Sequence, residues 1–102
     1  MKRVKISVIK RTAIDDLIKE YGRPDFGICT MHEEGQVYYC NDGPQKPEGL
    51  CDGAWICMSE YVMALAHGGQ NFYDGWINNP NVAIISCNDG LRPVIFKVEA
   101  ID

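Results

Sequence analysis

The feature that most constrains the fold is a helical pattern over residues 53–67 that is apolar on almost every side. One stripe consists of Trp55, Met58, Val62, Leu65 and Ala66, while Ile56, Cys57, Met63 and Ala64 occupy the other faces. Asp52 is the expected N-cap, and Gly68-Gly69 is expected to end the helix. Because a helix that is apolar all round has to be buried, the sequence predicts that a sheet wraps this helix or that a second subunit covers it.

Alternation of apolar and polar residues predicts strands on both sides of this helix. Val4, Ile6 and Val8 alternate with charged or polar neighbours, which indicates a first strand over 3–10. The same kind of pattern predicts further strands near 28–31 and over 36–40, 82–87 and 93–99. Asn88-Asp89-Gly90 is expected to form a tight hairpin turn before the last strand.

A short helix over 13–21, begun by Thr12 and ended by Gly22, is expected between the first two strands. The resulting order β-α-β-β-α-β-β belongs to the α+β class. It predicts a small mixed or antiparallel sheet, or a partial barrel, with one short and one long buried helix. The 102 residues suit a single domain, 1–102, and the turn-rich loop over 41–49 is too short to separate two domains.

Charge and hydropathy exclude two classes of partner. Ten Lys+Arg against 14 Asp+Glu give a net charge of −4 and a pI near 5.0, so no basic surface is expected for nucleic acid or anionic lipid. No apolar run approaches the roughly 18–20 residues needed to cross a bilayer. Lys5 and Lys10 interrupt the first segment before it reaches the length of a signal peptide. We therefore expect a cytoplasmic protein with no nucleic-acid or membrane partner.

The five cysteines are the main candidates for chemistry. An odd number cannot all pair, and the cytosol keeps thiols reduced, so free, buried or metal-bound thiols are expected. Cys51 directly precedes the long helix, where unpaired N–H groups and the helix dipole favour a thiolate. The alternative is that Cys51 is a small buried apolar side chain. Cys29, Cys51 and Cys87 would together suit zinc or iron if the three elements that carry them meet.

Two histidines are candidates for a fourth metal ligand, His32 and His67. Each has a simpler interpretation. His32 stands beside Glu33 and Glu34, which suggests a solvated turn residue, and His67 closes the long helix, where it would interact with the dipole. The sequence contains no Cys-x2-Cys pair, so the metal site is a hypothesis that depends on the fold.

Arg92 is the candidate cation for binding a ligand. It follows the predicted turn and precedes Pro93, so its guanidinium could be held rigidly against a carboxylate or phosphate. Alternatively, Arg92 pairs with Asp89 or Asp52 and only stabilises the hairpin. Aromatic side chains near the long helix could line an apolar pocket or pack in the core: Trp55, Tyr61, Phe72, Tyr73 and Trp76.

Several phrases of the sequence resemble a family of small uncharacterised proteins, of similar length, that is widespread in anaerobic bacteria and archaea. These phrases are the opening KRVKISVIKR, KPEGLCDGAW over 46–55, HGG over 67–69 and CNDGLRPVIFKVE over 87–99. The family's cysteines match Cys29, Cys51 and Cys87. Its Gly-Leu/Phe-Cys-x-x-Ala-Trp motif matches 49–55, and its Asp-Gly-x-Arg-Pro-Val motif matches 89–94.

The resemblance covers nearly the whole chain but implies no activity. Where the family often has Cys-Pro, this chain has Cys29-Thr30. The matched positions mark candidate ligand-binding residues without naming a chemistry: Cys51, Trp55, Asp89 and Arg92.

Three functions are consistent with these features. The first is a small binding domain whose metal or small-ligand site uses the three cysteines and Arg92. The second is a homo-oligomeric interaction module or accessory subunit, in which the apolar helix and the aromatic loop make the contacts. The third is a thiol-dependent enzyme with Cys51 as nucleophile and His67 as base. Those two residues would lie roughly 24 Å apart on one helix, so only a partner subunit could bring them together.

Overall fold

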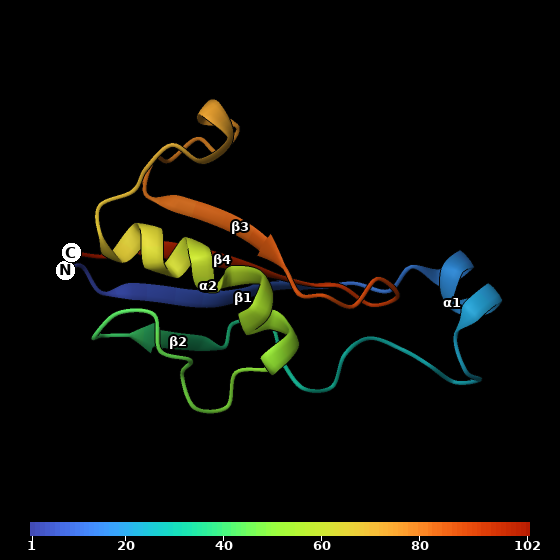
Figure 1. Ribbon diagram of the computed structural model, residues 1–102. Helices are drawn as coiled ribbons and strands as arrows, with labels where there is room; N and C mark the ends of the chain where they lie inside the picture. The colour runs from blue at the N-terminus through green and yellow to red at the C-terminus, as the bar shows by residue number, and fades with distance from the viewer.

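The computed structural model describes residues 1–102 and contains one antiparallel sheet of four strands (Figure 1). The elements are β1 (Val4–Arg11), α1 (Asp15–Tyr21), β2 (Val37–Cys40), α2 (Asp52–Ala66), the 3-10 helix η1 (Phe72–Gly75), β3 (Val82–Ser86) and β4 (Val94–Ala100). The strands lie in the order β2-β1-β4-β3. The predicted α+β class is confirmed, and the sheet is open and antiparallel.

The alternating pattern of the terminal strands builds the core. Ile6 of β1 pairs with Val98 of β4, and Val8 pairs with Phe96, so these side chains emerge on the same face of the sheet. α2 lies across this face and contributes the buried side chains Ala54, Met58, Val62, Leu65 and Ala66. Burying each large apolar side chain stabilises the fold by about 1.5–3 kcal/mol. This core holds the loops at the ends of the sheet in place.

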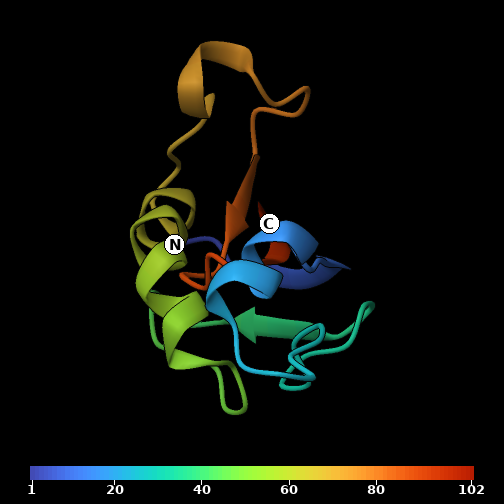
Figure 2. The same ribbon diagram turned by 90° about the vertical axis from the view of Figure 1, so that its right-hand side faces the viewer.

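The outer surface of α2 is not covered within one chain. Ile56 is 70% exposed, and Met63 is exposed as well. Figure 2 shows α2 on one side of the sheet. The alternative that the sheet wraps this helix is therefore wrong, because an open sheet of four strands offers it one surface. The alternative that a second subunit covers the helix stays a prediction. Neither helix has the length and apolar content needed to span a membrane.

α1 lies away from the core, beyond the end of the sheet (Figure 1). None of its residues is buried. The predicted cap by Thr12 is wrong, because the Thr12 hydroxyl donates to the carbonyl of Pro93 at 2.6 Å, and the helix begins after Ile14 without a side-chain cap. The Ile14 N–H donates to the carbonyl of Leu91. The base of α1 is thus tied to the connection between β3 and β4.

Two other local predictions fail at this end of the sheet. No strand forms near 28–31, so the observed order is β-α-β-α-β-β with an irregular segment over 22–36. This segment buries a polar ring, His32, in place of an apolar strand face. The predicted tight turn over 88–90 is a wider connection over 87–93, because Asp89 accepts hydrogen bonds from the backbone that follows it.

Candidate functional site

Asp89 shapes the connection between β3 and β4. Its Oδ1 accepts the N–H of Leu91 at 2.8 Å and the N–H of Arg92 at 3.2 Å. Its Oδ2 accepts the Nε–H of Arg92 at 3.3 Å. Burial by itself would raise the pKa of Asp89, but these hydrogen bonds outweigh burial and hold the pKa below its ordinary value. The ionised carboxylate therefore sets the direction in which the Arg92 side chain leaves the loop.

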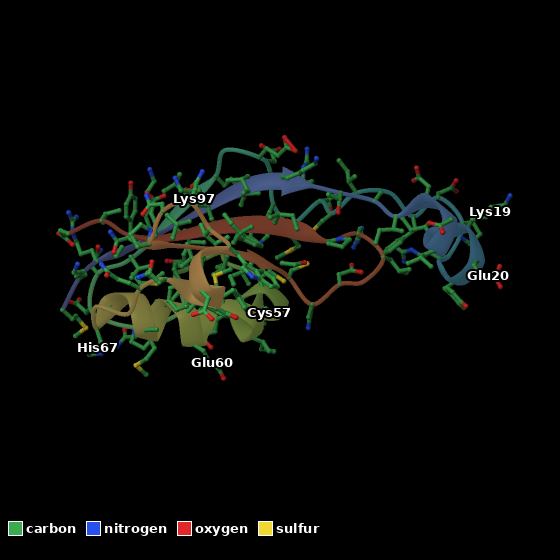
Figure 3. All side chains as sticks on the ribbon, turned by 90° about the horizontal axis from the view of Figure 1, so that it is seen from above. Lys19, Glu20, Cys57, Glu60, His67 and Lys97 are labelled. Atoms are coloured by element: carbon green, nitrogen blue, oxygen red, sulfur yellow. The ribbon has the colours of Figure 1, made fainter.

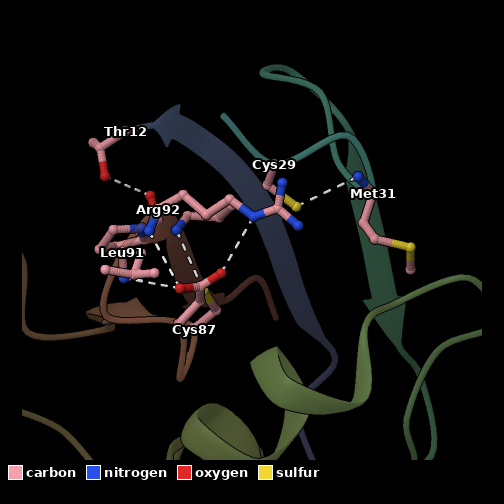
Figure 4. A network of polar contacts seen from close by, with 9 residues as sticks. Thr12, Cys29, Met31, Cys87, Leu91 and Arg92 are labelled. Carbon is pink, nitrogen blue, oxygen red and sulfur yellow. Dashed lines mark hydrogen bonds and ion pairs between the residues drawn. The ribbon is translucent and has the colours of Figure 1, made fainter. Parts of the chain in front are cut away.

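The Arg92 guanidinium is held from a second side by an aromatic ring. Its central carbon lies 4.0 Å from the centroid of Phe26, which is a cation–π contact. The Arg92 side chain is 24% exposed. Its Nε–H is bonded to Asp89, whereas Nη1 and Nη2 donate to no group of the chain, and Figure 4 shows this end pointing toward Cys29. The result is a partly buried, rigid fork with free donors.

Two further cations lie around Phe26. The guanidinium carbon of Arg23 is 5.4 Å from the same ring centroid. Phe26 and Arg23, together with Lys19, line a hollow of about 270 Å³, in which Asp25 is the one acidic side chain. Because the whole chain carries a net charge of −4, this gathering of cations runs against the overall charge. Lys19 and Arg23 outnumber Asp25 in this hollow, so its lining carries a net positive charge.

Two cysteines flank this corner (Figure 4). The Cys29 sulfur accepts the backbone N–H of Met31 at 3.4 Å, and the Cys29 carbonyl accepts the Nη1–H of Arg11 at 3.2 Å. The Cys87 sulfur accepts the N–H of Val94 at 3.3 Å. Because Arg11 pairs with Val94 between β1 and β4, Arg11 connects the segments that carry the two thiols.

Cys51 is tied to the irregular segment through His32, whose side chain is 1% exposed. The His32 Nε2 accepts the N–H of Cys51 at 3.2 Å, and Nδ1 lies 3.1 Å from both Gln36 Oε1 and the Tyr38 hydroxyl. Because a backbone N–H can only donate, this pattern assigns the proton of a neutral ring to Nδ1. The ring also packs edge-on against Phe96, at 5.6 Å between centroids. The interpretation of His32 as a solvated turn residue is therefore wrong, and neither nitrogen is free for a metal.

The geometry gives no support to the predicted zinc or iron site of Cys29, Cys51 and Cys87. No group of three or more His, Cys, Asp or Glu side chains is placed to hold a metal ion. His67 is exposed and follows the last residue of α2, at the opposite end of the helix from Cys51. Figure 3 shows His67 at one end of the molecule and Lys19 at the other. As expected, Cys51 and His67 form no pair within the chain.

Trp55 does not belong to the Arg92 corner. It lines a separate hollow of about 420 Å³ on the outer side of α2, with Pro44, Ser59, Glu60 and Met63. Of the four predicted ligand-binding residues, the structure brings Asp89 and Arg92 into contact, places Cys51 at the start of α2 and leaves Trp55 elsewhere.

The other predicted aromatic residues gather between α2 and η1 and do not form a closed pocket. Tyr61 packs edge-on against Phe72 at 5.4 Å, and Tyr73 stacks on Trp76 at 5.1 Å. Trp76 is 81% exposed, so this cluster lies at the surface.

Sequence reasoning missed three participants at the Arg92 end of the sheet. Phe26 and Gln36 lie in an irregular segment with no periodic pattern, so no local signal marks them. Gly53 did carry a signal, because glycine in the first turn of a helix is unfavourable unless close packing requires it. Its Cα packs so tightly against Asn88 that a Cβ would overlap the amide oxygen. The start of α2 therefore adjoins the β3–β4 connection.

Comparison with protein-family models, with curated proteins and with solved structures finds no significant match to this chain.

Proposed function

We propose that this chain is a small ligand-binding domain that holds an anionic group, a carboxylate or a phosphate, through Arg92. The proposal rests on how the guanidinium is held and on which of its donors are free. Asp89 binds its Nε–H, Phe26 packs on its face, and Nη1 and Nη2 remain unbonded. A planar fork held in this way loses little conformational entropy on binding, and arginine pairs with planar anions through two parallel hydrogen bonds.

The surroundings of Arg92 support an anion in preference to a neutral ligand. Arg23 packs on the Phe26 ring that Arg92 also contacts, and Lys19 lines the hollow beside this ring together with Asp25. The hollow of about 270 Å³ is lined by Phe26 and not by Arg92, so it adjoins the guanidinium through the Phe26 ring. Asp89 accepts two loop N–H groups and the Arg92 Nε–H, so it leaves the Nη1 and Nη2 donors of Arg92 unoccupied. Cys29 and Cys87 border the site as thiols.

Titration with inorganic phosphate and with succinate, followed by amide and Arg side-chain NMR signals, tests this proposal. Arg92→Lys should weaken binding about tenfold or more while leaving the far-UV spectrum unchanged, because a lysine cannot reproduce the bidentate fork. Arg3→Lys is the matched control. Arg3 also binds a carboxylate through Nε, at 2.7 Å from Asp102, but it lies at the exposed chain termini. Equal loss in both variants, or binding that survives Arg92→Lys, contradicts the proposal.

A second candidate function is self-association as an interaction module, and the exposed surface favours it. The chain exposes 6303 Å², whereas a monomer of 11.5 kDa typically exposes about 5800 Å². Its radius of gyration is 14.4 Å, compared with about 13 Å for a compact domain of this length. We propose a homo-oligomer that recovers part of this excess surface. Its assay is the molar mass in solution, and a strictly monomeric protein would contradict it.

We also propose that the domain works in the cytoplasm. All five cysteines are free thiols, which suits a reducing compartment. We further propose that the chain is related to the small proteins of anaerobic bacteria and archaea. The proposal rests on the shared motifs around Cys51 and Arg92.

A further inference from the structure

One buried side chain fixes the irregular segment over 22–36 to the core. His32 is 1% exposed, whereas every other residue of the segment is exposed or only partly buried. A segment with few buried contacts can open locally at a lower cost in free energy than global unfolding. The attachment of this segment therefore depends largely on the state of one imidazole ring.

The contacts of the His32 ring require its uncharged form. Nε2 accepts the Cys51 N–H at 3.2 Å, so this nitrogen carries no proton in the folded chain. Nδ1 lies 3.1 Å from both Gln36 Oε1 and the Tyr38 hydroxyl. A proton added at Nε2 would face the Cys51 N–H, and two donors form no hydrogen bond with each other. The contact that joins the segment to the start of α2 is therefore lost when the ring is protonated.

The groups packed around the ring supply no counter-charge. Tyr38 of β2 and Cys51 at the start of α2 adjoin the two nitrogens, and phenols and thiols are ordinarily neutral below about pH 8. β4 contributes Phe96, which packs edge-on against the ring. Neither nitrogen forms an ion pair with a carboxylate.

The charged side chains next to the ring do not compensate a positive charge either. Glu33 and Glu34 follow His32 in the chain, and both are exposed. Glu34 Oε1 accepts the backbone N–H of Arg11 in β1, and Arg11 Nη1 donates to the Cys29 carbonyl. Because Arg11 is a cation, it does not stabilise an imidazolium on the same segment.

We propose that His32 is a pH-sensitive attachment: as the pH falls, the ring takes up a proton, leaves its buried position and releases the segment over 22–36 from the start of α2. A solvated imidazole is protonated below about pH 6.5. The released form then binds one proton more than the attached form. The equilibrium constant for release therefore rises up to about tenfold for each pH unit below this value.

Release also changes the surroundings of Arg92. The segment carries Phe26, whose ring lies 4.0 Å from the guanidinium carbon of Arg92. When the segment leaves, the guanidinium loses the ring that restrains it, so acid should weaken anion binding. This consequence rests on the proposed anion site, whereas the release itself does not.

Hydrogen exchange of the wild-type chain between about pH 7.5 and about pH 5 measures the release. The readout is the protection of the Cys51 amide, corrected for the intrinsic pH dependence of exchange. We expect this protection to fall up to about tenfold per pH unit below about pH 6.5. At each pH it should stay below the protection of the β1 and β4 amides, because the release is local. Protection that does not change with pH, or that equals the protection of β1 and β4, overturns the proposal.

His32→Gln and His67→Gln separate the two histidines of the chain. A glutamine can accept the Cys51 N–H but does not titrate, so His32→Gln should keep the segment attached and remove the pH dependence. His67 is exposed at the end of α2, so His67→Gln is the matched control and should behave as the wild type. A pH dependence that persists in His32→Gln, or that disappears in His67→Gln, contradicts the role of His32. The exchange of the wild type decides the question even if His32→Gln fails to fold.

Titration with sulfate at the two ends of this pH range tests the consequence for Arg92. Binding should weaken in acid for the wild type and for His67→Gln, and persist for His32→Gln. Binding to the wild type that does not change with pH overturns the link between the segment and Arg92. Absence of binding at either pH contradicts the anion site, while the exchange of the Cys51 amide still decides on the release.

Discussion

The buried His32 ring connects the irregular segment over 22–36 to the start of α2. Replacing it should lower the free energy of unfolding for two reasons that can be separated, the loss of a hydrogen bond and the loss of the ring itself. His32→Phe keeps a ring of similar size against Phe96 but leaves the Cys51 N–H without an acceptor. Gln36 and Tyr38 retain their mutual hydrogen bond at 3.3 Å, so the loss falls on one donor. An unsatisfied donor of this kind costs about 1–3 kcal/mol of the free energy of unfolding.

His32→Ala removes the ring as well. The side chain is 1% exposed and packs against Phe96 and Tyr38, so its truncation leaves a cavity in the core. We expect a total cost of about 3–5 kcal/mol, by analogy with other large-to-small core substitutions. Since a small domain is stable by about 5–15 kcal/mol, His32→Ala should come close to unfolding the chain.

Urea denaturation followed by circular dichroism measures both costs, with the slope m checked for constancy. His67→Phe and His67→Ala are the controls, because His67 is exposed at the end of α2 and should change stability by less than about 0.5 kcal/mol. The expected order of stability is wild type, then His32→Phe, then His32→Ala. Should the His32 variants be no less stable than the His67 controls, the hydrogen bond to Cys51 and the burial of the ring would not be structural supports.

Two further predictions concern titratable groups. The folded pKa of Asp89 is lowered, so its contribution to stability is present above the ordinary value of 3.8 and is lost as pH falls through the lower folded value. Asp89→Asn should therefore reduce the urea midpoint at neutral pH and converge with the wild type below pH 3.8; parallel curves would count against it. Burial raises the pKa of Cys40 to about 11, so iodoacetamide in mildly alkaline buffer should label it last of the five thiols, and peptide mass mapping would expose any earlier labelling.

The regular elements of this protein were predictable because their patterns are local. Val4, Ile6 and Val8 alternate within one strand, and each of them faces the core. The stripe along α2 that contains Met58 and Val62 is the buried face of that helix. The stripe could not show that Ile56 and Met63 are exposed, because exposure on the far side of a helix depends on how many layers the rest of the chain supplies.

Of the contacts that Arg92 makes, one could be predicted from the sequence and one could not. The pairing of Asp89 with Arg92 was one of the sequence alternatives, because the two residues stand three positions apart in one turn. Phe26 beneath the guanidinium was not foreseen, since it lies in a segment without periodicity and meets Arg92 only in the folded chain. The predicted strand near 28–31 failed for a related reason: a few apolar residues in a row do not determine pairing when no neighbouring strand accepts them.

The sequence by itself determined an α+β fold with a sheet built from its alternating strands, one long apolar helix and a candidate arginine after a turn. The tertiary structure alone decided that His32 is buried against Cys51, that Phe26 and Asp89 hold the Arg92 fork, that the cysteines form no metal-binding group, and that β3 is an outer strand of the sheet. The physical reason is the range of the interactions. Periodicity and turn chemistry act over a few residues, whereas these contacts join segments that are distant in the chain and meet only after the core has packed.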